Sequence, residues 1–330
     1  MLTVLKPTPE NLDRAATSLA EGRLVAFPTE TVYGLGAHAL DPLALARIFT
    51  AKGRPLFDPL IVHLADIAWL PRLCAWVDPR AERLAERFWP GPLTLVLPKT
   101  SLVPELATAG LPTVAVRMPA HPVALDLIRR TGFPLAAPSA NPFGRLSPTT
   151  AAHVAGSFSE GIDFVVDGGP CAVGVESTIL SLAGEATILR AGGISREDLE
   201  AVIGPVTLAA PDPGRPMAPG QLPSHYAPRT PLRLLQGPAR PEDAAPGCGL
   251  LAFRSAPGSA GFAAVEILSP WGDMTEAAAR LFACLHRLDA ASLRMILAEP
   301  IPGTGLGLAI MDRLGKAAGP RPHPGAPARH

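Results

Sequence analysis

Residues 24–53 read LVAFPTETVYGLGAHALDPLALARIFTAKG, and this stretch decides the fold class. It opens on the short apolar run Leu24–Phe27, which Pro28 bounds, and such a run is typical of a buried strand. Asp41 and Pro42 then form a good N-cap and first helical position, and Gly53 follows the helix that they start. A strand joined to a helix in this way predicts an α/β fold.

The same alternation of apolar runs and helix signals continues through most of the chain. Thr8 is placed to cap one helix, and a helix that begins near His121 is expected to stop near Gly132. The runs Ser177–Leu182 and Thr187–Leu189 are close enough to form a hairpin, which favours a mixed sheet over a purely parallel one. The predicted strands are Leu24–Phe27, Leu60–Ala65, Thr94–Leu97, Thr113–Met118, Pro134–Ala137, Phe164–Val166, Ser177–Leu182 and Thr187–Leu189.

A proline-rich stretch divides the chain. Residues 205–231 hold eight prolines and no apolar period, which is typical of an interdomain linker. We therefore predict a first domain over 1–205, a linker over 206–231, and a second domain over 232–330. The second domain is expected to be small, α/β and Rossmann-like in rhythm, with strands at Leu232–Leu235, Gly249–Phe253, Val265–Leu268 and Met295–Leu297 and helices over about 275–288 and 306–318.

Composition excludes several classes of protein. The chain has 330 residues, enough for about two domains, and 48% of them are hydrophobic, which excludes a disordered chain. Lys plus Arg is 29 and Asp plus Glu is 29, so the net charge of zero argues against a protein that binds duplex nucleic acid by charge alone. The four cysteines lack C-x-x-C spacing, so they are expected to be small buried hydrophobes. With no signal peptide and no membrane span, the protein is predicted to be soluble and cytoplasmic.

The common catalytic motifs are absent. The chain has no G-x-x-x-x-G-K-[ST] phosphate loop, no H-E-x-x-H and no G-x-S-x-G, and its eight histidines are scattered. No metal site built from protein residues is therefore predicted. Gly303–Gly307 precedes a helix and resembles a dinucleotide-binding turn, but it lacks the third glycine at the required spacing. We interpret it as a tight strand-to-helix turn.

Polar residues gather instead at the ends of predicted strands, where open α/β sheets bind ligands. Residues 27–36 are expected to form a turn shaped by glycine and proline that offers two hydroxyls and a carboxylate. Residues 52–55 place two cations on another turn. Arg117 ends an apolar strand, which suits a carboxylate clamp, although a surface ion pair is the simpler interpretation. His63 has the same ambiguity, since most histidines inside strands belong to the core. Further polar groups stand at 138–142, 176–178 and 190–193.

Together these residues supply lysine, arginine, histidine and hydroxyl groups without a metal cage or an activated covalent nucleophile. That set fits electrostatic handling of phosphates together with a small carboxylate. Lys52 and Arg54 are the predicted charge-stabilising pair for a triphosphate, and Arg117 is the predicted carboxylate clamp.

At these positions the sequence resembles the threonylcarbamoyl-AMP synthases, the YrdC-type family. The resemblance covers almost all of residues 5–205, and the linker HYAP (225–228) and the terminal GLGLAIMDRLGKAAG (305–319) resemble the long, two-domain form. The matching motifs are PTETVYGLG (28–36), KGRP (52–55), DPLIVH (58–63), WPGPLTLVL (89–97), TVAVRMPAHP (113–122), APSAN (137–141), DGG (167–169), GVESTI (174–179) and LRAGGI (189–194).

The resemblance implies a twisted mixed sheet with flanking helices and a concave basic cavity. It implies the reaction of L-threonine, bicarbonate and ATP to give threonylcarbamoyl-AMP and pyrophosphate, with Mg²⁺ accompanying ATP and no organic cofactor. The product would pass to the tRNA threonylcarbamoyl transferase machinery, which modifies tRNAs that read ANN codons. A basic cavity of this kind also implies a weak contact with RNA, whereas contact with a membrane is not expected.

The resemblance also assigns site residues. The K-x-R and S-x-N signatures of the family fall on Lys52, Arg54, Ser139 and Asn141. Asp58 departs from the family, which often has Asn there, so its role stays open: a carboxylate beside phosphates needs a ribose hydroxyl, Mg²⁺ or Arg54 as partner. The implied ATP contacts are Lys52, Arg54, Asp58, Thr113, Ser139, Asn141, Ser147, Arg190 and Tyr226, and the implied threonine contacts are Thr31, His63, Arg117, the backbone at Ala137, and Ser177.

Several alternatives remain from the sequence alone. The first is an RNA-binding module with a YrdC-type fold, which neutral charge and 5% aromatic residues disfavour. The second is carbamoyl transfer in hydrogenase maturation, whose proteins carry zinc motifs and an acylphosphatase-like domain that this sequence lacks. The linker is either a lid that folds over the active site through Tyr226 or a passive tether. The second domain could also bind a regulatory nucleotide or partner.

Overall fold

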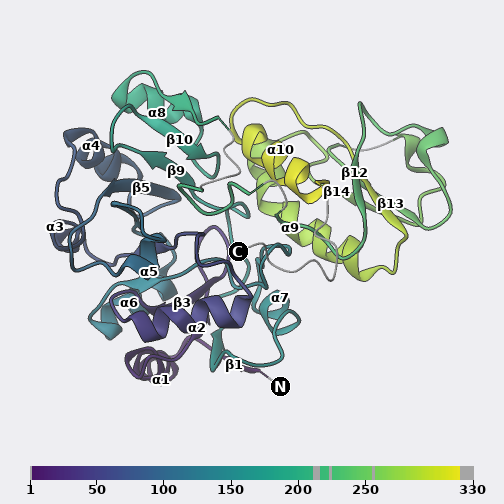
Figure 1. Ribbon diagram of the computed structural model, residues 1–330. Coiled ribbons are helices and arrows are strands. Elements are labelled where there is room, and N and C mark those ends of the chain that lie inside the picture. The colour runs from purple at the N-terminus through teal and green to yellow at the C-terminus, as the bar shows by residue number, and fades with distance from the viewer. Residues whose placement is uncertain (1, 211–215, 223–224, 255–256, 320–330) are drawn as a thin grey trace.

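Two sheets, one large and one small, organise the chain. The computed structural model describes residues 2–210, 216–222, 225–254 and 257–319. The large sheet has 11 strands in the order β1-β8-β2-β3-β7-β4-β6-β5-β9-β10-β11, and the small sheet has four in the order β12-β15-β13-β14. Figure 1 shows the small sheet with helices α9 and α10 beside the large sheet, and α10 on the side nearer to β9 and β10.

The large sheet is mixed, as the sequence predicts. The β9–β10 hairpin is antiparallel, whereas β4 pairs with β6 and β5 with β9 in parallel. Its strands are β1 (Thr3–Leu5), β2 (Val25–Phe27), β3 (Gly34–His38), β4 (Ile61–His63), β5 (Leu93–Pro98), β6 (Thr113–Arg117), β7 (Leu135–Ala136), β8 (Phe164–Val166), β9 (Thr178–Ser181), β10 (Thr187–Arg190) and β11 (Thr207–Leu208).

Helices flank this sheet on both faces. Leu12 and Leu19 of α1 pack with Leu127 of α6 in one apolar cluster, and Leu45 of α2 and Leu84 of α4 belong to another. These helices are α1 (Pro9–Ala20), α2 (Pro42–Lys52), α3 (Leu70–Leu73), α4 (Pro79–Phe88), α5 (Glu105–Thr108), α6 (Pro122–Thr131), α7 (Ala151–Ala155) and α8 (Arg196–Ile203), with a 3₁₀ turn at Ile67–Trp69.

The predicted caps are confirmed at two helices. Thr8 Oγ1 accepts from Asn11 N before α1, and Asp41 Oδ1 accepts from Leu43 N at 2.9 Å before α2. Gly53 ends α2 with φ +59°, a left-handed conformation that glycine adopts without steric cost. The turn that Gly53 makes directs the following Arg54 back toward the sheet, where it reaches the site described below.

The structure corrects two parts of the predicted organisation. The segment 27–36 was expected to be a turn throughout, but its last residues start strand β3. That strand needs glycine because a Cβ on Gly36 would lie 2.7 Å from a ring carbon of Phe27. The second correction is at Thr207–Leu208, within the predicted linker, which pairs in parallel with β10 as strand β11.

The small sheet is wholly parallel, which agrees with the predicted Rossmann-like alternation of strands and helices. Gly307 lies in the first turn of α10, where a Cβ would meet the Pro302 carbonyl oxygen at 1.8 Å, so close packing accounts for this glycine. The elements are β12 (Leu232–Leu234), β13 (Cys248–Ala252), β14 (Ala264–Ile267), α9 (Met274–Ala290), β15 (Met295–Ala298) and α10 (Leu306–Ala317), with 3₁₀ turns at Pro241–Asp243 and Pro257–Ser259.

One apolar cluster joins the two sheets. Phe282 of α9 and Ile310 of α10 share it with Val175, which precedes β9, and with Tyr226. The small domain therefore packs directly on the segments that lead into the large sheet. All four cysteines are buried and free, as predicted. Among the described residues, no helix combines the length and apolar character needed to cross a bilayer.

Candidate active site

A cavity lies where several strands of the large sheet end. Its lining comes from the turn after β2, the ends of β4, β6 and β10, the loop after β7 and the segment before β9. The predicted linker closes the remaining side. We call its described residues 216–222 and 225–228 the strap. Predicted site residues that line the cavity are Thr31, Arg54, His63, Arg117, Ala137, Ser139, Ser177, Arg190 and Tyr226.

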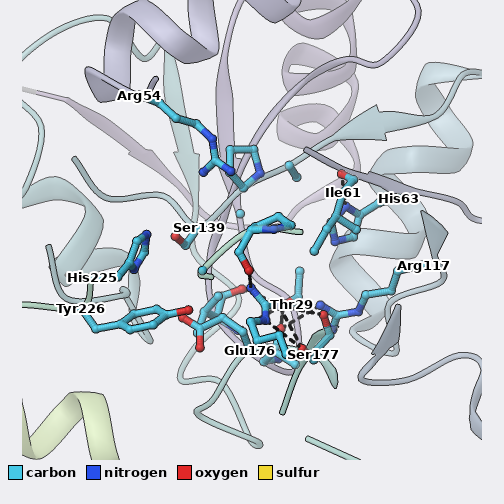
Figure 2. A pocket seen from close by; sticks show the side chains of 18 residues that line it. Thr29, Arg54, Ile61, His63, Arg117, Ser139, Glu176, Ser177, His225 and Tyr226 are labelled. Carbon is cyan, nitrogen blue, oxygen red and sulfur yellow. Dashed lines mark hydrogen bonds between the residues drawn. The ribbon is translucent and has the colours of Figure 1, made fainter. Parts of the chain in front are cut away.

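The predicted site residues separate within the cavity. In Figure 2, His63 and Arg117 lie on one side of the view, and Arg54, Ser139 and Tyr226 lie on the other. The first group was assigned to threonine and the second to the nucleotide. The cavity therefore has two neighbouring regions, which are lined by different side chains.

Arg117 is held by three partners from separate segments. Its Nε donates to the Gly91 carbonyl at 3.2 Å, Nη1 to Thr31 Oγ1 at 3.0 Å and Nη2 to Glu30 Oε1 at 2.6 Å. A guanidinium has five N–H groups, so one N–H remains on each terminal nitrogen. That pair is the fork with which arginine binds a carboxylate.

Arg54 lies against Asp58, which is four residues further along the chain. Its Nε donates to the Asp58 carbonyl at 3.2 Å and its Nη2 to the Pro59 carbonyl at 2.8 Å, which leaves Nη1 without a partner among the described residues. The Asp58 carboxylate lies 2.9 Å from Nη2, yet it accepts no aligned hydrogen bond from any described residue. Burial raises the pKa of Asp58, and the Arg54 and Lys52 charges oppose that rise.

Lys52 supports a loop of the cavity. Its Nζ donates to the carbonyls of Ser139, at 2.6 Å, and of Asn141. The ammonium is buried outside the cavity lining, and burial holds its pKa well below the ordinary value, with the neighbouring Arg54 charge adding to the effect. Lys52 thus fixes the S-x-N loop from behind, and one N–H remains for another acceptor.

Arg190 joins the segment before β9 to the strap. Its Nη2 donates to the carbonyl and hydroxyl of Ser177, at 2.9 and 3.2 Å, and its Nη1 donates to the Pro219 carbonyl at 3.3 Å. Ser177 Oγ also lies 2.8 Å from Thr94 Oγ1 on β5. These contacts hold Ser177 at the wall of the cavity.

The strap brings Tyr226 into the cavity. Tyr226 has φ +61°, which costs a non-glycine residue strain, and strain of this kind concentrates at functional sites. Its hydroxyl is buried with no hydrogen-bond partner among the described residues, and so is His225 Nδ1. Buried polar atoms are nearly always satisfied, so these two atoms point to a ligand or to solvent inside the cavity.

His63 is an imidazole kept neutral by its surroundings. Its Nδ1 lies 3.2 Å from the Ile61 carbonyl oxygen, and only the protonated nitrogen can donate there. Burial, reinforced by the Arg117 charge, lowers the pKa of His63 to about 3. A neutral imidazole with Nδ1 protonated leaves Nε2 as an acceptor.

This lowered pKa predicts a pH-dependent stability. The unfolded chain binds a proton on His63 below about pH 6.5 and the folded chain does not, so the free energy of unfolding falls as pH drops from 6.5 toward 3. The expected contribution is about 1.4 kcal/mol per pH unit, or about 2 kcal/mol between pH 6.5 and 5. Urea unfolding of the wild type and of His63→Gln at pH 7 and pH 5 measures it. Equal losses in the two proteins would show that His63 titrates as in the unfolded chain.

Other predicted residues support the lining without belonging to it. Asn141 Nδ2 donates to the carbonyls of Pro142 and Arg145, and Ser147 Oγ donates to Glu176 Oε1 at 2.5 Å. Thr113 begins β6, at the opposite end from Arg117. The predicted set outside the lining is Lys52, Asp58, Thr113, Asn141 and Ser147.

Sequence reasoning missed several contributors. Glu30 and Glu176 pair with arginines that lie far away in the chain, and His225 and Gly220 line the cavity from the strap. Arg313 of α10 reaches the same region from the small domain. The local signal for Glu30 was its place within PTETVYGLG, and that for Arg313 was its place within the terminal motif at 305–319.

The described residues hold no group of three or more histidine, cysteine or acidic side chains suited to a metal ion. Glu176 lines the cavity, but its two oxygens already accept from Ser147 and Arg313. Asp58 lies behind Arg54 and outside the lining. These residues do not form a cage for a divalent cation.

Two family descriptions match this chain. The one described as "Telomere recombination" matches residues 17–192, and "Threonylcarbamoyl-AMP synthase, C-terminal domain" matches residues 194–319. The chain is 45% identical over 324 residues to the threonylcarbamoyl-AMP synthase of Pyrococcus abyssi, covering 93% of this chain and 94% of that protein. It is also 45% identical over 333 residues to that of Bacillus subtilis, covering 96% and 95%.

Solved structures give the same likeness. The structure of Pyrococcus abyssi Sua5 complexed with L-threonine has a TM-score of 0.87 and 42% identity, covering 96% of this chain and 97% of that chain. Escherichia coli YciO, with a TM-score of 0.51 and 22% identity over 58% of this chain, shares the fold of the first domain.

Proposed function

The chain belongs to the threonylcarbamoyl-AMP synthase family, in the form with the additional C-terminal domain, and from this premise we propose its substrates and the roles of its residues. It is an enzyme of the transferase class. The proposed reaction joins L-threonine, bicarbonate and ATP to give threonylcarbamoyl-AMP and pyrophosphate.

The convergence of three buried arginines on one cavity carries this proposal. Arg54, Arg117 and Arg190 are each less than 10% exposed, and all three line the cavity. The one carboxylate in the lining, Glu176, is already paired. Arg117 and Arg54 pair with Glu30 and Asp58, which lie outside the lining. Both arginines keep N–H groups without a partner among the described residues, and such groups fit a ligand with several negative charges, such as a triphosphate with an amino acid.

The threonine region is built around Arg117. The free N–H groups on its two terminal nitrogens receive the substrate carboxylate, while Thr31 and Ser177 fix the remaining polar groups of the amino acid. The amine must be neutral to attack carbon dioxide or bicarbonate. The positive charge of Arg117 disfavours an ammonium beside it, and neutral His63 can accept a hydrogen bond from the uncharged amine. We assign His63 no proton transfer.

The nucleotide region is built around Arg54. Its free Nη1 faces the phosphates, and Lys52 supports the Ser139–Asn141 loop that contacts them. The unpartnered Tyr226 hydroxyl and His225 Nδ1 complete the wall from the strap. These atoms lack protein partners, so they can bind the nucleotide without breaking existing hydrogen bonds.

The chemistry then proceeds without a covalent enzyme intermediate. The threonine nitrogen forms a bond to the carbon of bicarbonate, and water leaves as the carbamate forms. A carbamate oxygen attacks the α-phosphorus, and the bond from this phosphorus to the pyrophosphate oxygen breaks. Arg54 stabilises the charge that moves onto pyrophosphate. A closed cavity protects the unstable carbamate from water.

Mg²⁺ is proposed to arrive with ATP. Because the described carboxylates near the cavity are paired or lie behind Arg54, the ion would be held by phosphate oxygens and water, as is common for Mg²⁺ with nucleotides. It would neutralise phosphate charge.

The product is a mixed anhydride of a carbamic acid and AMP, which is an activated donor. A transfer reaction must therefore consume it. We propose that the tRNA threonylcarbamoyl transferase machinery does so in the cytoplasm, modifying tRNAs that read ANN codons.

Release of pyrophosphate tests the function directly. It is measured from ATP with threonine and bicarbonate omitted one at a time. The proposal expects release that needs both, an AMP-linked product and no ADP. ADP formation would contradict the mechanism, and salt-sensitive RNA binding without turnover would favour the RNA-binding module instead.

A further inference from the structure

The last helix of the small domain reaches the active site. The terminal motif of the chain forms α10, and its Arg313 is 0% exposed. Arg313 Nε donates to Glu176 Oε2 at 2.7 Å and Nη2 to the Ala191 carbonyl at 3.0 Å. Both acceptors belong to the large domain, next to Ser177 and Arg190. The proposed reaction gives α10 no role so far.

Arg313 also touches the strap. Its Cζ lies 4.9 Å from the centroid of the Tyr226 ring, within the range of a cation–π contact. The same ring packs against Phe282 of α9, with centroids 5.8 Å apart. Two helices of the small domain therefore form the surface on which the Tyr226 ring rests.

Lys316 holds a second point of the strap. Its Nζ donates to the Gly220 carbonyl at 2.6 Å and pairs with Asp312 Oδ1 at 2.6 Å. A Cβ on Gly220 would lie 2.5 Å from the Tyr226 hydroxyl and 3.2 Å from Arg190 Cδ. The position of the Gly220 backbone therefore limits where the Tyr226 hydroxyl and the Arg190 side chain can lie.

The charged groups at this junction are buried, and burial of a charge costs free energy. Burial would raise the pKa of Glu176, but the Arg313 and Arg190 charges outweigh it and keep the pKa below its ordinary value. A buried ion pair usually adds little net stability, because both charges must leave water. Its value here lies in the geometry that it fixes.

We infer that Arg313 and Lys316 are positioning residues, through which α10 sets the strap and Glu176 in the arrangement that closes the nucleotide region. Arg313 fixes the Glu176 carboxylate and the Tyr226 ring, and Lys316 fixes Gly220 against the Tyr226 hydroxyl. The small domain thus supplies the support for one wall of the catalytic cavity. This inference rests on the proposed function, because it concerns the binding of ATP.

Lys316→Met in the full chain tests it, since substitution of the fully buried Arg313 is expected to disrupt folding. The KM for ATP should rise about tenfold, the scale of one lost charged hydrogen bond, with the KM for threonine nearly unchanged. Lys99→Met is the matched control. Lys99 likewise donates to one carbonyl, of Val103, and to one carboxylate, of Glu105, but outside the cavity lining. Equal KM values for ATP in the two variants would overturn the inference.

A second measurement tests whether Lys316 affects ATP binding through Tyr226 or directly. If Lys316 acts through the strap, Lys316→Met should raise the KM for ATP no further in a Tyr226→Ala background. Multiplicative effects would show that Lys316 acts on ATP independently, which overturns the inference. A wild type without pyrophosphate release would instead refute the proposed function. Normal wild-type turnover with an unchanged Lys316→Met variant refutes this inference alone.

Discussion

Replacing Arg117 by alanine is expected to raise the KM for L-threonine about 100-fold, while the KM for ATP changes less than about threefold. The guanidinium has one free N–H on each terminal nitrogen after its bonds to Gly91, Thr31 and Glu30. Two charge-assisted hydrogen bonds to one carboxylate account for the size of the loss, about 3 kcal/mol. Steady-state pyrophosphate release at varied threonine and varied ATP measures both constants.

A second substitution distinguishes a loss of threonine binding from a loss of fold stability. Arg117→Ala leaves the Glu30 carboxylate, 8% exposed, with the Ala120 N–H as its remaining hydrogen-bond donor among the described residues, and an uncompensated buried charge destabilises the fold. The double variant Arg117→Ala/Glu30→Gln removes that charge. We expect it to recover the melting temperature and to keep the high KM for threonine. Similar losses in both KM values would refute the assignment of Arg117 to the amino acid.

Glu30 also shows what local sequence cannot reveal. The position of Arg117 at the end of an apolar strand predicts a functional cation, and the structure brings it to the cavity. Its partner lies in a different motif, 87 residues away in the chain. Local patterns identify which side chains carry chemistry, whereas the pairing between them depends on the order of the strands.

The same difference between local patterns and distant pairing explains which parts of the fold could be predicted from the sequence. Short runs of branched apolar residues gave most strands within one or two residues of their ends, because burial on both faces requires an almost wholly apolar sequence. Strand β3 was missed because its glycines meet a tight contact with Phe27, and glycine alone favours a turn. The contact of Arg313 with Glu176 joins two domains, so the terminal motif marks the residue but not its partner, which lies 137 residues away in the chain.

Arg54→Met is expected to lower kcat/KM for ATP about 1,000-fold, since it removes the cation proposed to stabilise the departing pyrophosphate. About 4 kcal/mol corresponds to two charged hydrogen bonds that tighten as charge moves onto the leaving group. The free Nη1 supplies both donors. Pyrophosphate release at limiting ATP measures the loss.

Stability again must be separated from catalysis. Without Arg54, the Asp58 carboxylate stays 1% exposed and retains only the charges of Lys52 and Arg190, and a buried pair broken on one side typically costs about 3–5 kcal/mol. Asp58→Asn removes the charge that would be stranded. The double variant Arg54→Met/Asp58→Asn should therefore unfold at nearly the wild-type urea concentration and still lack activity. If activity returned together with stability, Arg54 would serve only to neutralise Asp58, and the stabilisation of pyrophosphate would have to come from Arg190 or Lys52.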